Sequence, residues 1–430
     1  MLLLVLTASA CENQQQPEAT PTPTPATPAR TVSSDPSAAP DDPEADDQSR
    51  CDESTRFVCI WQTSGGSHER VPLGVMYVGS PRDDTFVVWD RGGPGIALPR
   101  STHDLDGLVP TQLRQRNLFI FAERWEMEPP DEACLELLID PSATCRIDRY
   151  VTSDSDIRSA IEAAQQTTSK TLDGAYLDSF GSTRSALLLV EQFPELRWLV
   201  LDSPAPFPGD TFERLLQARR EALLSLLKDS CATSADCRGA LSESLVHLAS
   251  QRDAVVSGRD LVLGLASAAT LPSQNADFIA EVAREVAAGR ISSETATRLR
   301  LLSGAYRGVT QGGLVSPSTV GLWADTCSRL AGWSEVARDP DPIIGALSET
   351  YAGCANADPG VRQPPRSLWC GSVRTLLVVS KTDAVVPPDI QDEWGSSSCP
   401  DVTRISATEH FHKEPATIRQ ISKWIELADS

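Results

Sequence analysis

Short apolar runs recur along the chain after residue 51, and most of them lack a regular alternation with polar residues. Runs of this kind are typical of strands that are buried on both faces of a sheet. Helix-like segments such as Asp156–Gln166 and Thr183–Phe193 lie between them, and this alternation predicts a mostly parallel sheet with helices on both faces. The predicted strands are Thr85–Trp89, Leu118–Phe121, Trp198–Leu201, Arg374–Val379 and Val402–Ile405.

Residues 207–365 carry a different pattern, with helical periodicity and few strand-like runs. We therefore predict a helical cap at 207–365, inserted between two halves of the sheet domain at 51–206 and 366–430. The helices predicted within it are Phe212–Lys228, Gly239–Gln251, Asn275–Ala288 and Ser293–Leu302.

Residues 1–11 have the pattern of an export signal. The apolar segment Met1–Leu6 is followed by small residues and then by Cys11, which is typical of a secretory signal. Small residues directly before a cysteine are also similar to a bacterial lipoprotein cleavage site, at which the cysteine is lipidated. We therefore predict lipidation of Cys11, and a plain secretory signal that happens to contain a cysteine is the alternative.

Residues 12–50 are predicted to be a disordered linker. Pro17–Pro28 alternates proline with threonine and alanine, and Asp41–Asp47 is mostly acidic. Neither segment has an apolar period that would bury enough surface to offset the entropy lost on ordering. Proline-rich chain is stiff and extended, which suits a spacer between a lipid anchor and a folded domain. A tail without a role is the alternative.

The charge balance excludes some classes of partner. The chain has 38 basic and 59 acidic residues and a formal net charge of −21, so it repels nucleic acids. It has no apolar run of about 20 residues, as an ordinary membrane-spanning helix requires. We expect an exported protein, either anchored at the outer face of the cell membrane or secreted, that touches the membrane only through a lipid on Cys11.

Eleven cysteines favour disulfides in an exported protein. They form no C-x-x-C pairs and have no histidines nearby, so we expect no zinc site. Setting Cys11 aside leaves ten cysteines, an even number. The sequence leaves their connectivity open, and proximity along the chain favours the pairs Cys51–Cys59, Cys134–Cys145, Cys231–Cys237, Cys327–Cys354 and Cys370–Cys399.

A glycine-rich loop, Gly92-Gly93-Pro94-Gly95, follows the first predicted strand. Glycines at a strand end allow backbone N–H groups to approach a ligand closely, and such amides can hold a developing oxyanion. A phosphate-binding loop is disfavoured because the Lys-Ser/Thr ending that it requires is missing. A simple tight turn is the remaining alternative.

Ser179 lies between an apolar stretch and a predicted helix. A serine on a sharp strand-to-helix turn projects its hydroxyl from the sheet edge, where the amide of Phe180 and the helix N-terminus stabilise negative charge. Gly181 fits the second glycine of the G-x-S-x-G pattern, whereas Leu177 replaces the first. A helix N-cap serine is the alternative interpretation.

Two later segments supply an acid and a base. Asp383 follows the strand Arg374–Val379, where a carboxylate can orient a histidine; an Asx-turn residue is the alternative. Among the five histidines, only His410 and His412 follow a predicted strand beyond this acid. A metal site from this pair lacks a third ligand at useful spacing, so we expect no metal and no cofactor.

The order of the glycine loop, Ser179, helical insert, Asp383 and His410 is the chain order of α/β-hydrolases. Each element alone is a weak signal, whereas the four in this order, each at a predicted strand end, are much stronger. The sequence therefore predicts an α/β-hydrolase, a doubly wound, mostly parallel sheet with an inserted helical cap.

The same segments resemble one branch of this superfamily. The Gly92–Gly95 loop is similar to the G-G-P-G loop of proline iminopeptidases and tripeptidyl aminopeptidases. Tyr176–Arg184 resembles the Y-G-x-S-Y-G-T-R block of the tripeptidyl branch, and Trp198–Pro206 resembles the next strand with its turn. The resemblance implies that Ser179 is the nucleophile, Asp383 the orienting acid and His410 the base, with the Gly93 and Phe180 amides as oxyanion hole.

Several departures from that family leave the substrate class open. Leu177 replaces a glycine, and one extra residue precedes Arg184. Ala122–Trp125 stands where the family has D-x-R-G, so that the arginine is kept as Arg124 while the acid and the glycine are lost. Glu409 replaces the small residue before the histidine, and His412 remains an alternative base.

These observations predict an exported serine hydrolase that acts as a monomer on a peptide or a small acyl substrate. The resemblance favours an aminopeptidase that releases short N-terminal peptides or residues through an acyl-enzyme. The same machinery also suits a carboxylic-ester hydrolase. A catalytically inactive α/β-hydrolase-fold envelope protein is the third possibility, because Leu177 and Glu409 depart from the pattern.

Overall fold

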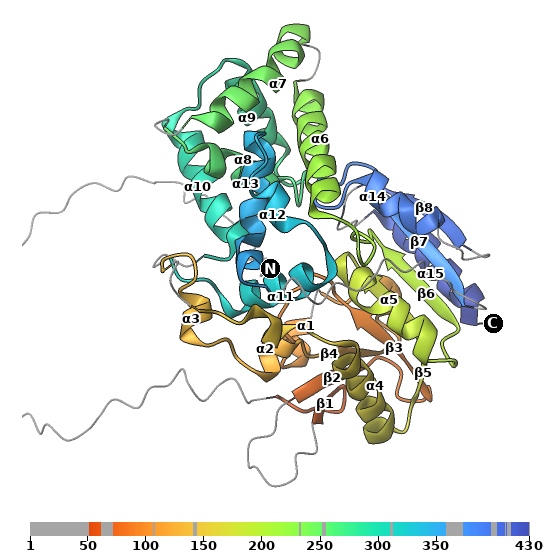
Figure 1. Ribbon diagram of the computed structural model, residues 1–430. Coiled ribbons are helices and arrows are strands. Elements are labelled where there is room, and N and C mark those ends of the chain that lie inside the picture. Colours follow the sequence, from red (N-terminus) through yellow and green to blue (C-terminus); the bar gives the residue numbers. More distant parts are fainter. Residues whose placement is uncertain are drawn as a thin grey trace, which may run out of the picture. The chain divides into compact units, whose positions relative to one another are not determined.

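A computed structural model describes most of the chain after residue 50 (Figure 1). The predicted signal, the linker, Cys11, the pair Cys370–Cys399, Glu409 and His412 lie outside the described residues. Those that are described belong to one compact unit. They are 51–61, 72–105, 108–140, 144–231, 234–251, 255–309, 313–357, 373–396, 402–408, 410 and 414–429.

The described strands form one eight-stranded sheet in the order β1-β2-β4-β3-β5-β6-β7-β8. From β4 and β3 through to β8 all neighbouring pairs are parallel, and β2 is antiparallel to both of its neighbours. The strands are β1 (Phe57–Trp61), β2 (Pro72–Val78), β3 (Thr85–Asp90), β4 (Asn117–Phe121), β5 (Thr171–Asp178), β6 (Trp198–Asp202), β7 (Arg374–Ser380) and β8 (Val402–Ala407).

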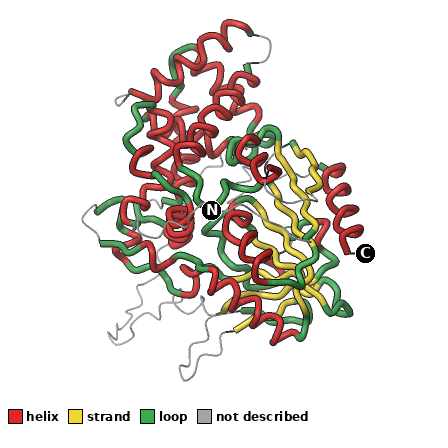
Figure 2. Tube along the Cα trace, turned by 45° about the vertical axis from the view of Figure 1, so that its right-hand side comes forward, coloured by secondary structure: helices red, strands yellow, loops and turns green. Residues whose placement is uncertain are grey.

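Both faces of the sheet are covered by helices (Figure 2). On one face, α4 (Asp154–Thr168) and α5 (Phe180–Gln192) pack against Phe86 and Val88 of β3. On the other face, α15 (Pro415–Asp429) packs in the cluster that contains the alternate β3 residues. Successive residues of β3 thus point to different buried faces, which is why its sequence is an unbroken apolar run.

The described residues between β6 and β7 fold into helices and connecting turns (Figure 1). These helices share a hydrophobic core that is separate from the two sheet faces. Several begin at a serine whose hydroxyl accepts the amide of the third helical residue, as expected for an N-cap. They are α6 (Phe212–Ser230), α7 (Ala235–Ser250), α8 (Gly258–Ala268), α9 (Ala276–Ala287), α10 (Ser293–Arg307), α11 (Pro317–Arg329), α12 (Trp333–Val336), α13 (Pro342–Ser348) and the 3-10 helix η3 (Glu349–Asn356).

The fold class predicted from the sequence is confirmed: the protein has the α/β-hydrolase fold, with helices inserted between β6 and β7. The prediction missed β1 and β2 as strands, and it placed Ser179 at the end of a strand without giving bounds for that strand, which is β5. The remaining short helices lie in the connections: α1 (Thr102–Leu105), η1 (Thr111–Leu113), α2 (Arg124–Met127), α3 (Glu132–Leu135), η2 (Ile147–Tyr150), α14 (Pro388–Asp392) and η4 (Glu393–Ser396).

Helix α11 joins the inserted helices to the connection between β4 and β5. Its residues Val320 and Trp323 share a buried cluster with Ile147 and Tyr150. Four disulfides lie in the described residues, and one of them ties α11 to η3. They join Cys51 to Cys59, Cys134 to Cys145, Cys231 to Cys237 and Cys327 to Cys354.

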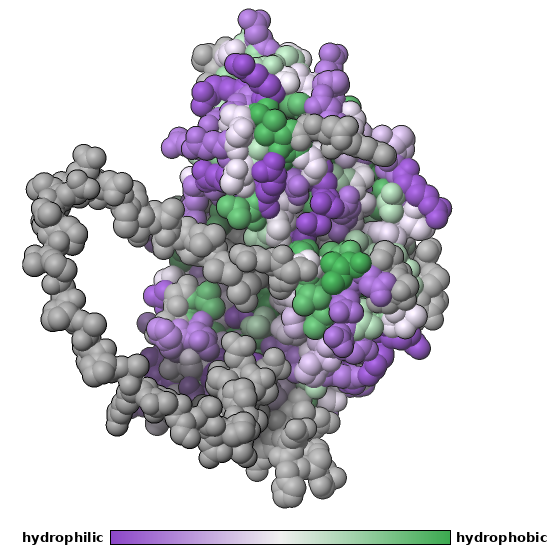
Figure 3. All heavy atoms as spheres, turned by 90° about the vertical axis from the view of Figure 1, so that its left-hand side faces the viewer, coloured by the Kyte–Doolittle hydropathy of each residue, from purple (hydrophilic) through white to green (hydrophobic). Residues whose placement is uncertain are grey.

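Few large apolar side chains are exposed among the described residues. None of the helices that the structure describes has both the length and the apolar character needed to cross a membrane. On the face shown in Figure 3, polar side chains surround small, separate apolar patches. The exposed large hydrophobic residues of the described chain are Leu108, Ile139, Val255, Leu301, Leu314 and Leu427.

Replacing both Cys327 and Cys354 by alanine should destabilise the protein without changing its fold. The bridge spans 27 residues, and closing a loop of that length stabilises the folded state by about 3 kcal/mol in the chain-entropy model. Thermal unfolding of the double variant, followed by circular dichroism, should show a lower Tm with an unchanged native spectrum. An equal Tm would show that this bridge does not constrain the inserted helices.

Candidate active site

Ser179 occupies a strained turn at the carboxyl end of β5. Its backbone has φ 48° and ψ −117°, a region that non-glycine residues rarely adopt. The Ser179 amide donates to the Asp202 carbonyl at 2.8 Å, and the Ser179 carbonyl accepts the Ala205 amide at 3.0 Å. Such strain costs on the order of 1–3 kcal/mol and persists only when the surroundings hold it. The hydrogen bonds to the end of β6 provide that support.

Ser179 is not an ordinary helix cap. It stands directly before α5, yet its side chain accepts no hydrogen bond from the first turn of that helix. The side chain is only partly buried, whereas Leu172–Leu177 of β5 are buried. The hydroxyl therefore remains available at the sheet edge, and the N-cap alternative does not hold.

The residues that flank Ser179 explain which glycine of the pattern is needed. A Cβ on Gly181 would lie 2.7 Å from the Asp90 carbonyl oxygen, so this position has no room for a side chain. Leu177, in contrast, is fully buried and packs in the apolar cluster between β5 and the helices. The larger residue is accommodated in the core, and the turn at Ser179 still closes.

The glycine loop packs directly against the serine turn. Gly92 has φ +69°, and a Cβ on it would collide with the Asp178 carbonyl and lie 3.2 Å from the Phe180 amide nitrogen. Within the part of the chain that is described, the amides of Gly93 and Phe180 donate no hydrogen bond. Two donors are thus left beside Ser179, one from the loop and one from the first turn of α5, where the helix dipole favours negative charge.

Asp383 and His410 form a buried pair. His410 Nδ1 lies 2.5 Å from Asp383 Oδ2, and only 6% of His410 and 2% of Asp383 are exposed. Asp383 Oδ1 also accepts the amides of Val385 and Val386, at 2.7 and 2.9 Å, and its Oδ2 accepts Gln391 Nε2. Asp383 is therefore an Asx-turn residue and the partner of a histidine at once, so both interpretations of the sequence apply.

The serine and the buried pair lie at the same edge of the sheet. Strands β5, β6, β7 and β8 are parallel neighbours, so their carboxyl ends share one edge. Between them, the Ser203 hydroxyl at the end of β6 lies 3.3 Å from the His410 carbonyl oxygen. Phe180 and Val386 also share a small buried cluster. The described residues show no hydrogen bond between Ser179 and His410, and such contacts often form only when substrate binds.

A buried acid, Glu123, stands one position after Ala122, in the segment that the sequence analysis compared with D-x-R-G. Glu123 is 3% exposed and pairs with Arg184, and its other oxygen accepts the Gly95 amide at 2.7 Å. Arg124, which the sequence suggested as the retained family residue, instead pairs with Glu128 at the surface. Sequence reasoning missed Glu123 and the role of Arg184, because their partners lie far away along the chain.

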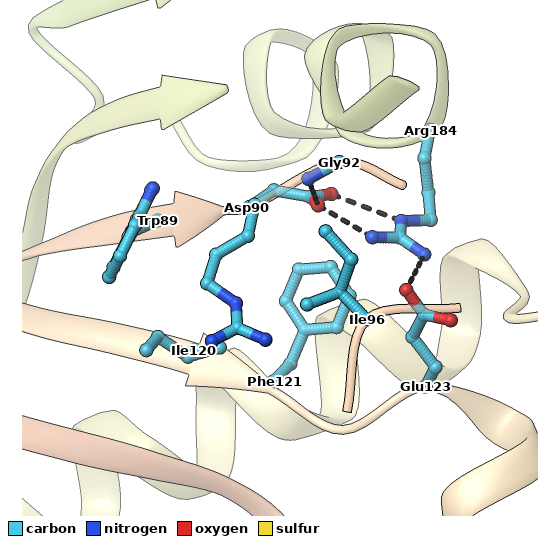
Figure 4. A pocket seen from close by; sticks show the side chains of 9 residues that line it. Trp89, Asp90, Gly92, Ile96, Ile120, Phe121, Glu123 and Arg184 are labelled. Carbon is cyan, nitrogen blue, oxygen red and sulfur yellow. Dashed lines mark hydrogen bonds and ion pairs between the residues drawn. The ribbon is translucent and has the colours of Figure 1, made fainter. Parts of the chain in front are cut away.

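Two cavities border these residues. One, of about 280 Å³, lies between α6 and the turn after β7; its lining includes Asp383 together with Glu221, Asp229 and Asp389. The other is only about 10 Å³ and lies behind the glycine loop (Figure 4). Among the described side chains, no group of three or more His, Cys, Asp or Glu is arranged to hold a metal ion.

Comparison with known proteins identifies no close relative. No protein-family model matches the chain, and no curated protein sequence matches it. The most similar solved structures include a proline iminopeptidase from Mycobacterium smegmatis, at 13% identity over 87% of this chain and 99% of that one, with a TM-score of 0.39. At such values the comparison does not distinguish one activity from another.

Two further solved structures match to a similar degree. An acetylester hydrolase from Corynebacterium glutamicum matches at 13% identity over 87% of this chain and 95% of that one, with a TM-score of 0.41. A haloalkane dehalogenase from Bradyrhizobium elkani matches at 14% identity over 87% and 99%, with a TM-score of 0.36. The fold assignment therefore depends on the strand order of this sheet itself.

The partly buried Glu126 should make stability depend on pH. Burial raises the pKa of Glu126 from 4.5 to about 7. The amides of Leu98 and Glu123 donate to its carboxylate and lower the pKa, but their effect is smaller than that of burial. Because the folded-state pKa is the higher one, the contribution of Glu126 to stability is complete below pH 4.5 and is lost as the pH rises through 7.

Glu126→Gln imitates the protonated side chain. The Tm of the wild type should therefore fall relative to the Tm of this variant between pH 5 and pH 8, since other groups titrate equally in both proteins. Parallel Tm curves over this range would show that Glu126 is ionised throughout.

Proposed function

We propose that the protein is a serine hydrolase in which Ser179 is the nucleophile, His410 the general base and Asp383 the acid that orients it. The observation that carries this proposal is the strained turn at Ser179, whose side chain caps no helix. The amides of Gly93 and Phe180 donate to no group in the described part of the chain. A buried Asp–His pair at the same edge of the sheet supplies the partner that a serine hydroxyl needs.

The proposed reaction is acyl transfer in two steps. His410 takes the hydroxyl proton of Ser179 as its oxygen attacks the substrate carbonyl carbon, and the amides of Gly93 and Phe180 stabilise the resulting oxyanion. The tetrahedral adduct then breaks its bond to the leaving group, which receives the proton from His410. A water molecule, deprotonated by His410, attacks the acyl-enzyme and releases the acid together with free Ser179.

Asp383 keeps the histidine in the tautomer that this cycle requires. Since Asp383 Oδ2 lies beside Nδ1 of His410, the proton of the neutral ring is held on Nδ1. Nε2 then carries the lone pair that accepts the serine proton. The amides of Val385 and Val386 and the Gln391 side chain donate hydrogen bonds to Asp383 and fix its orientation.

The inserted helices favour an exopeptidase. Helix α11 lies so close to the glycine loop that a Cβ on Gly95 would collide with the Ser318 carbonyl, and Ala218 of α6 packs against the cluster of Phe180. Helices on both sides of the proposed nucleophile restrict access to chain ends or small molecules. The carboxylates of Glu221 and Asp229, beside the cavity at Asp383, would attract a free amino terminus.

Replacing Ser179 by alanine should lower kcat by about 10⁴-fold or more, because the nucleophile is lost while the fold remains. Activity is measured on peptide p-nitroanilides with a free amino terminus and on p-nitrophenyl esters. Ser293→Ala, at an exposed position of α10, is the matched control and should keep full activity. Turnover by Ser179→Ala at the wild-type rate would contradict the proposed nucleophile.

The two substrates also separate the two activities. An aminopeptidase hydrolyses the p-nitroanilide and loses that activity when the amino terminus is acetylated. Hydrolysis of esters alone would identify a carboxylic-ester hydrolase with the same triad.

We also propose that the protein is exported and held at the outer face of the membrane by a lipid on Cys11. The four disulfides in the described residues support an oxidising compartment. In a bacterial host grown with radiolabelled palmitate, the wild type should incorporate label and sediment with membranes. Cys11→Ala should lose the label, and equal labelling of the variant would rule out this anchor.

A further inference from the structure

We propose that Arg184 is a positioning residue that fixes the oxyanion loop Gly92–Gly95 through two buried carboxylates. The inference rests on the proposed function only in that it takes this loop to hold the oxyanion. The arrangement itself is seen in the contacts around one guanidinium, which binds Asp90 at the end of β3 and Glu123 just after β4 (Figure 4). The same guanidinium also binds Asp325 of α11.

The Arg184 guanidinium binds three carboxylates. It contacts Asp90 twice, with Nη2 at 2.5 Å from Oδ1 and Nε at 3.1 Å from Oδ2. Its Nη1 donates to Glu123 at 2.7 Å and to Asp325 at 2.9 Å. All four side chains are almost completely buried. Burial alone would lower the pKa of Arg184, but the three carboxylates outweigh it and hold this pKa well above its ordinary value.

Two of these carboxylates also hold the loop. Asp90 Oδ1 accepts the amide of Gly92 at 3.1 Å, and Glu123 Oε2 accepts the amide of Gly95 at 2.7 Å. The loop is thus fixed at its first and last residues, on either side of Gly93. Arg184 touches neither glycine by itself, but it determines where both acceptors stand.

The geometry requires an arginine. A planar guanidinium presents five N–H donors in a fixed fork, so it can bind Asp90 with two parallel bonds while it donates to Glu123. A lysine carries one compact charge and cannot span both acceptors in the same way. Without the fork, Asp90 and Glu123 are like charges buried near each other, and they must separate or bind protons. Either response moves the acceptors of the loop amides.

The third carboxylate provides an internal control. Asp325 belongs to α11 and binds the same guanidinium, but its other oxygen accepts the Thr152 amide at 2.7 Å rather than an amide of the loop. Loss of the Asp325 charge therefore weakens the same buried cluster without releasing the loop. A cluster that only stabilises the fold would respond similarly at Arg184 and at Asp325.

Amide hydrogen exchange of residues 92–95 in the full chain tests the proposal without assuming any activity. Arg184→Lys should raise the exchange rates of the Gly92 and Gly95 amides about tenfold or more relative to wild type, since local opening becomes easier. Asp325→Asn should leave these rates within about twofold, even where both variants lower the Tm. Unchanged rates in folded Arg184→Lys, or an equal rise in both variants, would overturn the proposal.

Kinetics give the second readout. With whichever substrate the wild type hydrolyses, Arg184→Lys should lower kcat by about 10- to 100-fold and leave KM within about twofold, because only the transition state uses the loop amides. Asp325→Asn should keep kcat near wild type. If Arg184→Lys does not fold, Glu123→Ala tests the same loop through Gly95 and should show the same exchange and kcat changes; their absence counts against the proposal.

The two proposals fail separately. A wild type that hydrolyses nothing removes the proposed function, while the exchange experiment still decides whether Arg184 fixes the loop. If the wild type is active but substitution of Arg184 or Glu123 changes neither the exchange of the loop amides nor kcat, only the positioning role of Arg184 is refuted.

Discussion

The positive φ of Ser179 is the constraint on which the rest of the site depends. A serine in this conformation is held because its amide donates to Asp202, the last residue of β6, and its carbonyl accepts the amide of Ala205, just after that strand. Among the described residues, the Phe180 amide at the start of α5 has no hydrogen-bond partner. Gly181 is needed because a Cβ at this position would collide with Asp90. Gly92 is needed because a Cβ there would collide with the Asp178 carbonyl in the serine turn.

The same edge of the sheet gathers groups from distant parts of the chain. Asp383 and His410 follow β7 and β8, the glycine loop follows β3, and Glu123 follows β4. Parallel strands direct their carboxyl ends to one edge, so side chains that follow them meet there whatever their separation in sequence. The inserted helices then close over this edge, and α11 contributes Asp325 to the buried cluster below the loop.

The buried charge of Arg184 is accommodated below the glycine loop by three carboxylates. Desolvation of one cation and three carboxylates is costly unless every oxygen and nitrogen is well paired. Here the carboxylates share the guanidinium, and they also accept hydrogen bonds from backbone amides of the loop and of Thr152, from the Ser185 hydroxyl and from the Trp125 indole. The buried cluster thereby joins the core, the glycine loop and an inserted helix.

Local patterns in the sequence predicted the parallel sheet, the helical insert and the positions of Ser179, Asp383 and His410 at strand ends. They did not predict how Leu177 is accommodated, because this depends on packing between β5 and the helices. They also did not single out Glu123, since its partner Arg184 is 61 residues away along the chain. Ser203 has the same positive φ as Ser179, so backbone conformation alone does not single out the candidate nucleophile. Ser203 differs because it is 1% exposed and its hydroxyl is hydrogen-bonded to that of Ser380.

Covalent labelling with a fluorophosphonate tests the central claim most directly. Native wild-type protein is treated with the reagent, digested, and mapped by mass spectrometry against heat-unfolded protein as the control. We expect one phosphonylated residue, Ser179, in the native sample and no adduct after unfolding. An adduct on another serine, or no adduct on folded protein, would contradict the account of Ser179 as an activated nucleophile.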